Sequence, residues 1–251
     1  AVMLVVKADA YGHGAVAVAH HALRSGTAML GVGTSAEALE LRAAGILAPI
    51  LVLGTIVDDE AALALRHGVH IALHSSDRCH MLQALAASLG VRAQVHLKID
   101  TGLGRLGVLP ERALDLLLEI RRSNHLELAG IMTHIGSGLG ALDPTASQQL
   151  AVFEDLLAAA REARLLGKAL IHAANSACIF TGLGPTYDLV RPGIGAYGVL
   201  PGRLGPGAEL CPVMSLKTQI VFLKDVPEGA PVGYEASWRA PKRTRIATIP
   251  V

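Results

Sequence analysis

Residues Val2–Val32 read VMLVVKADAYGHGAVAVAHHALRSGTAMLGV and contain an apolar run, a glycine-rich turn, a helical run and a second apolar run. The first run, Val2–Val6, and the last, Ala28–Val32, have the composition of buried β-strands. The segment AVAVAHHALRSG between them has helical spacing and ends at Gly26. Two strands joined by a helix predict parallel pairing through a right-handed crossover.

The same alternation continues along most of the chain. Helical runs such as SAEALELRAAG, where Ser35 is expected to cap the helix, lie between further apolar runs. Eight such units that close on themselves form a TIM (β/α)8 barrel, an α/β fold. An open, doubly wound sheet is the alternative, although no GxGxxG turn follows the first strand. The predicted strands are Val2–Val6, Ala28–Val32, Ile50–Leu53, Val69–Leu73, Ala93–Ile99, Leu128–Met132, Ala169–His172 and Tyr187–Arg191.

The pattern changes at LPGRLGPGAELCP, residues 200–212, which is rich in glycine and proline and indicates a linker. The segments VMSLKTQIVFLKDV and KRTRIATIPV follow it, with β-branched residues, partial alternation and no helical period. We therefore expect a barrel over residues 1–205 and the start of a smaller, incomplete antiparallel β domain over residues 206–251.

Composition excludes several classes of partner. The 251 residues carry 22 Lys and Arg against 21 Asp and Glu, and only 3% are aromatic, which argues against nucleic acid. Mean hydropathy is +0.44, but no uncharged apolar stretch is long enough for a bilayer, so no membrane partner is expected. Cys79, Cys178 and Cys211 lack CxxC spacing, which indicates reduced thiols in a cytoplasmic protein without a disulfide framework or a metal site.

Lys7 lies at the end of the first predicted strand, inside VVKADAYGHG (Val5–Gly14). It either reaches solvent from the strand end or is a buried, desolvated amine that attacks a carbonyl. The active site of a TIM barrel lies at the carboxyl ends of its strands, and other polar residues fall at such ends here. They are Tyr11 in the same motif, Lys98 and Arg105 in HLKIDTGLGRLG, His134 in GIMTHIGSG, Asn175 and Ser176 in IHAANSA, and Arg191 and Gly193 in DLVRPGIGAYG.

Each of these residues also has a purely structural explanation: Arg105 as a surface cation, His134 as a core histidine, Ser176 as a helix cap. Together they predict a cationic ring rich in hydrogen-bond donors. A lysine amine suits an aldehyde, and a serine at a helix start with the RPGI backbone amides suits a phosphate. An arginine without a nearby acid suits a neutral ring nitrogen or an oxyanion. Pyridoxal phosphate carries an aldehyde, a phosphate and a ring nitrogen, so it matches the whole set.

Five motifs in order, VVKADAYGHG, KIDTGLGRLG, MTHIGS, HAANSA and RPGIGAYG, resemble the hallmarks of the alanine racemases, a barrel-type (fold type III) family of pyridoxal phosphate enzymes. The resemblance covers essentially the whole chain. It implies interconversion of L- and D-alanine by a cytoplasmic homodimer that supplies D-alanine for peptidoglycan. The alternatives are a racemase for serine or another small amino acid, a pyridoxal phosphate-binding barrel without turnover, and a purely structural barrel.

The resemblance also implies a role for each matching residue. Lys7 would bind the cofactor covalently and act as one catalytic base. Arg105 would bind the phenolic oxygen of the cofactor and the substrate carboxylate, and His134 would lie beside the pyridine ring. Arg191 would donate to the ring nitrogen, and Lys98 matches a lysine that is often carbamylated and then fixes the arginine of the same motif. The remaining cofactor contacts would come from Tyr11, Ser176 and the backbone of Gly193 and Ile194 at the phosphate, with Asn175 supporting the ring.

A second base is implied as well. The family supplies it as a tyrosine from a GYADG-like segment of the smaller domain, which reaches across a dimer interface. The printed sequence contains no such segment, and neither Tyr197 nor Tyr234 lies in a matching motif. We therefore expect the chain as printed to be truncated at both ends and to racemise poorly.

Overall fold

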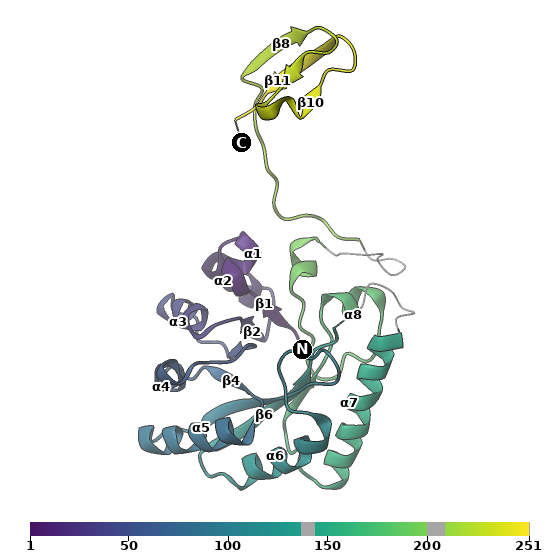
Figure 1. The fold of residues 1–251 in the computed structure, drawn as a ribbon. Helices are drawn as coiled ribbons and strands as arrows, with labels where there is room; N and C mark the ends of the chain where they lie inside the picture. The colour runs from purple at the N-terminus through teal and green to yellow at the C-terminus, as the bar shows by residue number, and fades with distance from the viewer. Residues whose placement is uncertain (137–143, 200–208, 251) are drawn as a thin grey trace. The chain divides into compact units, whose positions relative to one another are not determined.

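The computed structural model describes residues 1–136, 144–199 and 209–250, and the chain divides into two compact units, Ala1–Val213 and Met214–Val251 (Figure 1). The boundary predicted after residue 205 lies outside the described residues. In the described part of the chain, no helix is long and apolar enough to cross a membrane.

The first unit is built on a parallel sheet of seven strands whose spatial order is their order along the chain. Because neighbours in sequence are neighbours in space, the sheet has no point at which the strand order reverses. The strands are β1 (Met3–Val5), β2 (Met29–Val32), β3 (Ile50–Val52), β4 (His70–Leu73), β5 (Ala93–Ile99), β6 (Leu126–Thr133) and β7 (Leu170–His172).

The segment around Val190 closes this sheet into a barrel. Val190 forms a parallel bridge with Val2, and its carbonyl accepts a hydrogen bond from the N–H of Met3 at 2.9 Å. On its other side, Arg191 bridges Asn175, which follows β7. The predicted eighth strand is thus reduced to isolated bridges, but it occupies the closing position. This closure confirms the TIM-barrel fold class and excludes the open doubly wound sheet.

Helices lie along the outer side of the curved sheet (Figure 1). At the start of α3 the predicted cap is wrong: Thr34 caps the helix, because it keeps an extended backbone while Ser35 is already helical. Thr34 Oγ1 accepts from the N–H of Glu37 at 3.2 Å, and Glu37 Oε2 accepts in return from the N–H of Thr34. The helices are α1 (Lys7–Gly12), α2 (Ala15–Arg24), α3 (Ser35–Ala43), α4 (Asp58–Arg66), α5 (Ser76–Leu89), α6 (Pro110–Arg122), α7 (Pro144–Glu162) and α8 (Ser176–Thr181), with the 3-10 turn η1 (Ile194–Tyr197).

Side chains of the strands alternate between the barrel interior and the side that faces the helices. Leu4, Leu30 and Ile50 belong to the large cluster between strands and helices, which supplies most of the core. The interior is a separate, smaller cluster that fills the barrel, so polar residues at the carboxyl ends of the strands rest on a packed floor. Its buried members are Met3, Met29, Leu51, Ala72, Met132 and Leu189.

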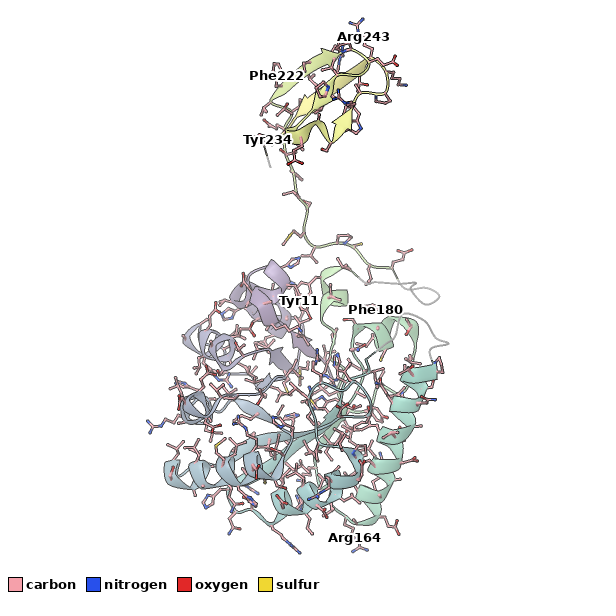
Figure 2. All side chains as sticks on the ribbon, viewed as in Figure 1. Tyr11, Arg164, Phe180, Phe222, Tyr234 and Arg243 are labelled. Carbon is pink, nitrogen blue, oxygen red and sulfur yellow. The ribbon has the colours of Figure 1, made fainter. Side chains whose placement is uncertain are left out.

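The second unit consists of two antiparallel strand pairs, as the sequence predicts. Strand β8 (Phe222–Val226) pairs with β11 (Thr244–Thr248), and β9 (Pro231–Val232) pairs with β10 (Trp238–Arg239). The 3-10 turn η2 (Tyr234–Ala236) lies between β9 and β10. Most described side chains of this unit are exposed, including those of Phe222 and Tyr234, which project from it in Figure 2.

Candidate active site

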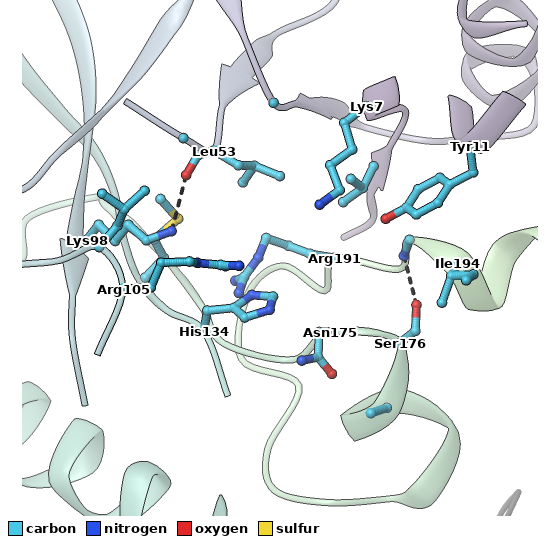
Figure 3. A pocket seen from close by; sticks show the side chains of 17 residues that line it. Lys7, Tyr11, Leu53, Lys98, Arg105, His134, Asn175, Ser176, Arg191 and Ile194 are labelled. Carbon is cyan, nitrogen blue, oxygen red and sulfur yellow. Dashed lines mark hydrogen bonds between the residues drawn. The ribbon is translucent and has the colours of Figure 1, made fainter. Parts of the chain in front are cut away.

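All ten residues that the sequence singles out line one cavity of ≈ 510 Å³ at the carboxyl ends of the barrel strands. Figure 3 shows Lys7 and Tyr11 on one side of it, and Lys98, Arg105 and His134 on the other. The roles inferred for these residues remain predictions, but the structure brings their side chains together. The ten are Lys7, Tyr11, Lys98, Arg105, His134, Asn175, Ser176, Arg191, Gly193 and Ile194.

A left-handed turn follows β1 directly. Ala8–Tyr11 have φ between 51° and 55°, a conformation that disfavours L-residues by about 1–2 kcal/mol each. Glu37 Oε1 accepts from the N–H of Ala8 in the turn, and Asp9 Oδ1 of the turn accepts from the N–H of Ala15 at the start of α2, both at 2.7 Å. Two carboxylates thus tie the turn to the starts of helices α2 and α3.

Lys7 extends from this turn into the cavity (Figure 3). Of the two alternatives for Lys7, the structure contradicts the buried one, because the residue is exposed. It sits at the open mouth of the barrel, where the sequence pattern of an apolar strand suggests burial but the strand has already ended. Its amine makes no hydrogen bond with the described residues and is free to meet a ligand.

Lys98 and Arg105 come from β5 and the loop after it. Lys98 is 5% exposed, and its Nζ donates to the carbonyl of Leu53 at 3.1 Å. Burial, followed by the charges of Arg191 and Arg105, lowers the pKa of Lys98 to about 8. Arg105 is exposed at the cavity, on a loop pinned by Asp100 Oδ1, which accepts two backbone N–H groups at 3.0 Å.

Arg191 is buried and held by three acceptors. Its Nη2 donates to the carbonyls of Thr133 at 2.6 Å and Ala173 at 3.0 Å, and its Nη1 lies 2.9 Å from His172 Nδ1. A guanidinium has five N–H donors, so two remain for a ligand in the cavity. Burial lowers the pKa of Arg191 to about 10, which still leaves it charged at neutral pH.

The cavity is strongly electropositive. Lys7, Lys98, Arg105 and Arg191 line it, and no carboxylate does so among the described residues. Burial, then Arg191 and the other nearby cations, lowers the pKa of His134 to about 3, so this half-buried ring is neutral. Such a site favours a ligand with several negative charges. In the described residues, no group of three or more His, Cys, Asp or Glu is placed to hold a metal ion.

The opposite end of the cavity forms a cradle for an anion. Ser176 Oγ accepts from the N–H groups of Gly193 at 2.8 Å and Gly195 at 3.1 Å, which leaves its own hydrogen free to donate. The Tyr11 hydroxyl makes no protein hydrogen bond within the described residues, and burial raises its pKa, so it also stays a donor. A Cβ on Gly193 would collide with that hydroxyl, so the cradle requires glycine.

Asn175 has a structural task as well as a place in the cavity wall. Its Oδ1 accepts from the N–H of Cys178 at 3.1 Å and caps α8, while its Nδ2 donates to the carbonyl of Ile135. Ile194 is exposed at the cavity edge and begins η1. Tyr197 is buried, and its hydroxyl donates to the carbonyl of Val5, so it is not available to move a proton in the cavity.

Sequence reasoning missed the residues that support Arg191. The sequence pattern indicates no role for His172 beyond the end of a strand, whereas the structure places it against the guanidinium. His96 also faces the barrel interior and contacts His172. The sequence does indicate the position of His96, because this residue precedes Lys98 by two positions in the same strand and the two side chains therefore lie on the same face.

These features fit pyridoxal phosphate. The free donors of Tyr11 and Ser176 and the glycine cradle suit its phosphate, and the two free N–H groups of Arg191 suit a neutral ring nitrogen. The unpaired amine of Lys7 suits its aldehyde.

Family models match nearly the whole chain. The alanine racemase N-terminal domain matches residues 1–201, and the alanine racemase C-terminal domain matches residues 213–251. The curated alanine racemase of Treponema denticola is 39% identical over 254 residues, covering 100% of this chain and 67% of the relative. That of Methanococcus maripaludis is 36% identical, with 100% and 68% covered.

Solved structures agree with this match. The alanine racemase of Clostridium difficile 630 superposes with a TM-score of 0.89 at 32% identity, over 100% of this chain and 66% of that one. The biosynthetic alanine racemase of Pseudomonas aeruginosa gives a TM-score of 0.86 at 32% identity, over 99% of this chain and 67% of that one. This chain spans about two thirds of the length of the relatives it matches. The chain thus belongs to the alanine racemase family, whose enzymes depend on pyridoxal phosphate.

Proposed function

We propose that the protein interconverts L-alanine and D-alanine, with pyridoxal phosphate bound in the cavity between Lys7 and Arg191. The observation that carries the proposal is the Lys7 amine, which has no hydrogen-bond partner among the described residues and faces three further cations across a cavity that none of their carboxylates lines. The match to alanine racemases at 36–40% identity over the whole chain supports the choice of alanine.

Pyridoxal phosphate, when bound, withdraws electrons from the Cα of an attached amino acid and so acidifies its α-proton. The Lys7 Nζ is the group of this chain that takes or returns that proton, because it is the flexible basic atom in the cavity. Arg105 is exposed across the cavity from Lys7 and is placed to bind the substrate carboxylate through its planar fork.

Arg191 directs the outcome of the proton transfer. A guanidinium donates hydrogen bonds and carries a permanent charge, so it disfavours protonation of a ring nitrogen placed against it. Negative charge that develops at Cα then spreads less into the ring, and the proton returns to Cα. This selects racemisation over transamination.

Racemisation also needs a proton donor on the face opposite Lys7. Among the described residues, the Tyr11 hydroxyl is assigned to the phosphate cradle, and the Tyr197 hydroxyl is engaged by the carbonyl of Val5. We therefore propose that the second group, a tyrosine, comes from the other copy in a homodimer. We also propose a cytoplasmic site of action, in the supply of D-alanine for peptidoglycan.

A panel assay tests the substrate. The protein, loaded with pyridoxal phosphate, is incubated separately with L-alanine, D-alanine, L-serine and other small amino acids, and the products are separated on a chiral column. We expect alanine to be converted fastest in both directions. Faster conversion of serine would identify a different racemase, and cofactor binding without conversion of any amino acid would identify a carrier.

A further inference from the structure

Three histidines from different strands form a hydrogen-bonded row behind Arg191. His172 Nδ1 lies 2.9 Å from Arg191 Nη1, and His172 Nε2 lies 2.9 Å from His96 Nδ1. His96 Nε2 in turn lies 3.1 Å from His70 Nδ1. The row runs through the barrel interior from β7 by way of β5 to the first residue of β4, where the outermost ring is half-buried.

The arginine sets the direction of every hydrogen bond in this row. A guanidinium can only donate, so His172 Nδ1 must accept and its proton must lie on Nε2. That proton is donated to His96 Nδ1, which places the His96 proton on Nε2 as well. The same step makes His70 Nδ1 an acceptor. All three rings are therefore in the Nε2–H tautomer, and their lone pairs point toward the cation.

The surroundings keep the row neutral. Burial, reinforced by Arg191, lowers the pKa of His172 well below the ordinary histidine value, and burial, then His70 and Arg191, lowers the pKa of His96 in the same way. Burial and the charge of Arg42 lower the pKa of His70 to about 4. Arg191 and Arg42 thus lie near opposite ends of the row, and none of the three rings takes up a second proton at neutral pH.

Gly130 in β6 shows that the barrel leaves space for the row. It pairs with His96 in the register of β5 and β6. A Cβ at this position would lie 2.8 Å from His96 Cε1 and 3.0 Å from His172 Nε2, and closer still to His96 Nδ1. Any side chain larger than hydrogen would therefore push the two rings apart.

We propose that His70, His96 and His172 are positioning residues, a one-directional relay that orients Arg191 without neutralising it. A carboxylate partner would hold the guanidinium equally well, but it would cancel the charge that faces the cavity. A row of aligned neutral rings presents only acceptor atoms and dipoles, so the full charge acts on the bound ring nitrogen. The catalytic part of this inference rests on the proposed function, whereas the tautomers do not.

The first test reads the tautomers directly. Long-range 1H–15N spectra of the 15N-histidine-labelled protein without cofactor distinguish Nε2–H, Nδ1–H and imidazolium rings. We expect three neutral Nε2–H rings whose signals do not titrate through neutral pH. Each is assigned by its disappearance in a single His→Gln variant. An Nδ1–H ring or an imidazolium at any of the three positions would overturn the relay.

The second test changes the outer end, where a variant least disturbs folding. His70→Gln keeps an acceptor for His96 through its amide oxygen, and His70→Leu removes it. In His70→Leu we expect His96 to keep the Nε2–H tautomer that His172 imposes but to lose the acceptor for this proton, so that the His96 ring signals and the Arg191 Nε–H signal broaden. With cofactor bound, kcat/KM for alanine should fall about fivefold, the effect of one hydrogen bond. His70→Gln should stay within about twofold of the unaltered protein.

Matched controls are His67→Leu and His67→Gln, because His67 is exposed three positions earlier in the chain. Equal behaviour of His70→Leu and His67→Leu in both the spectra and the kinetics would overturn the positioning role. If the loaded protein racemises no amino acid, the proposed function fails, and the spectra of the cofactor-free protein still decide the relay.

Discussion

The two sides of the cavity are built in opposite ways. On one side, Lys7 is exposed, its amine makes no hydrogen bond with the described residues, and a left-handed turn follows it. On the other, Arg191 is buried and held by two carbonyls and a histidine ring. The group that we propose to move a proton is left free, and the group that we propose to hold a charge in place is fixed.

The two sides of the cavity also differ in what constrains them. The strain lies in the backbone after Lys7, where Ala8–Tyr11 adopt positive φ. Around Arg191 the constraint lies in the side-chain contacts with Thr133, Ala173 and His172. Substitutions on the two sides should therefore have different effects. Those at Lys7 should lower the rate of racemisation, and those at Arg191 should change the ratio of products and lower the free energy of unfolding.

Lys7→Ala should have the largest effect. Loss of a positioned base lowers a rate by about a hundred- to ten-thousandfold, and we expect alanine racemisation to fall by that factor. Borohydride reduction of the loaded protein should fix the cofactor on the peptide that contains Lys7. Lys168→Ala, which removes an exposed lysine of the same unit, is the control and should retain activity and labelling. Labelling of another lysine in the unaltered protein would refute the assignment.

Arg191→Glu should come next. Removal of the donors leaves three buried acceptors without a partner, which should lower the free energy of unfolding by about 1–3 kcal/mol. Racemisation should fall by about a hundredfold, the scale for loss of one fixed electrostatic group. Transamination should rise, because the ring nitrogen is now able to take a proton. An unchanged ratio of the two products, measured by chiral separation and keto-acid analysis, would contradict the role of Arg191.

Lys98→Ala should have a smaller effect on rate. We propose that Lys98 is carbamylated in the active protein, since a carbamate would supply the negative charge that the cavity lacks beside Arg105. Its loss should lower racemisation by about tenfold through displacement of the arginine. Short carboxylic acids should restore part of the activity. Full activity of the variant without any added acid would rule the carbamate out.

The pH dependence of stability should report the same lysine. With carbon dioxide excluded, Lys98 has a pKa of about 8 in the folded protein, below its ordinary value, so the unfolded chain binds the proton more tightly. The free energy of unfolding should therefore rise by about 1–3 kcal/mol as pH increases from about 8 toward 10.5. Urea titrations of the protein and of Lys98→Met measure this slope, which the variant should lose.

Ala8→Gly should have the smallest effect, and this effect should be an increase in the free energy of unfolding. Glycine adopts positive φ without penalty, so we expect the free energy of unfolding to rise by about 0.5–1 kcal/mol. Ala17→Gly, at an exposed position inside the right-handed helix α2, should lower it by a similar amount. Two changes of the same sign in thermal unfolding would mean that the turn after Lys7 is not strained.

Most of the fold follows from local pattern. Alternating strands and helices predict the barrel, and Ala93–Ile99 coincides with strand β5 residue for residue. The left-handed turn could not be predicted, because alanine favours right-handed helix and the compensating contacts from Glu37 and Asp9 are tertiary. The eighth strand is reduced to isolated bridges of Val190 with Val2 and of Arg191 with Asn175, which the apolar pattern of the segment does not predict.

The residues that line the site could be predicted from the sequence, but the contacts that hold them in place could not. Strand ends identify Lys98, Arg191 and the others, since the barrel brings all such ends to one face. The His172 contact and the space left by Gly130 depend on which strands lie opposite each other across the interior. The exposure of Lys7 depends on where the strand ends relative to the barrel mouth.

Barrel closure has a kinetic consequence. The N–H of Met3 donates to the carbonyl of Val190 at 2.9 Å, so β1 is joined to a segment far along the chain. Contacts between residues so far apart in the sequence form late in folding, because closing the long loop between them costs conformational entropy before the contacts can contribute any stability. During synthesis, the edge of β1 that bonds to Val190 therefore stays unpaired until about residue 190 has left the ribosome. Lys7 and Arg191 meet only at that step, so a nascent chain cannot use its ligand as a folding template before the barrel is complete.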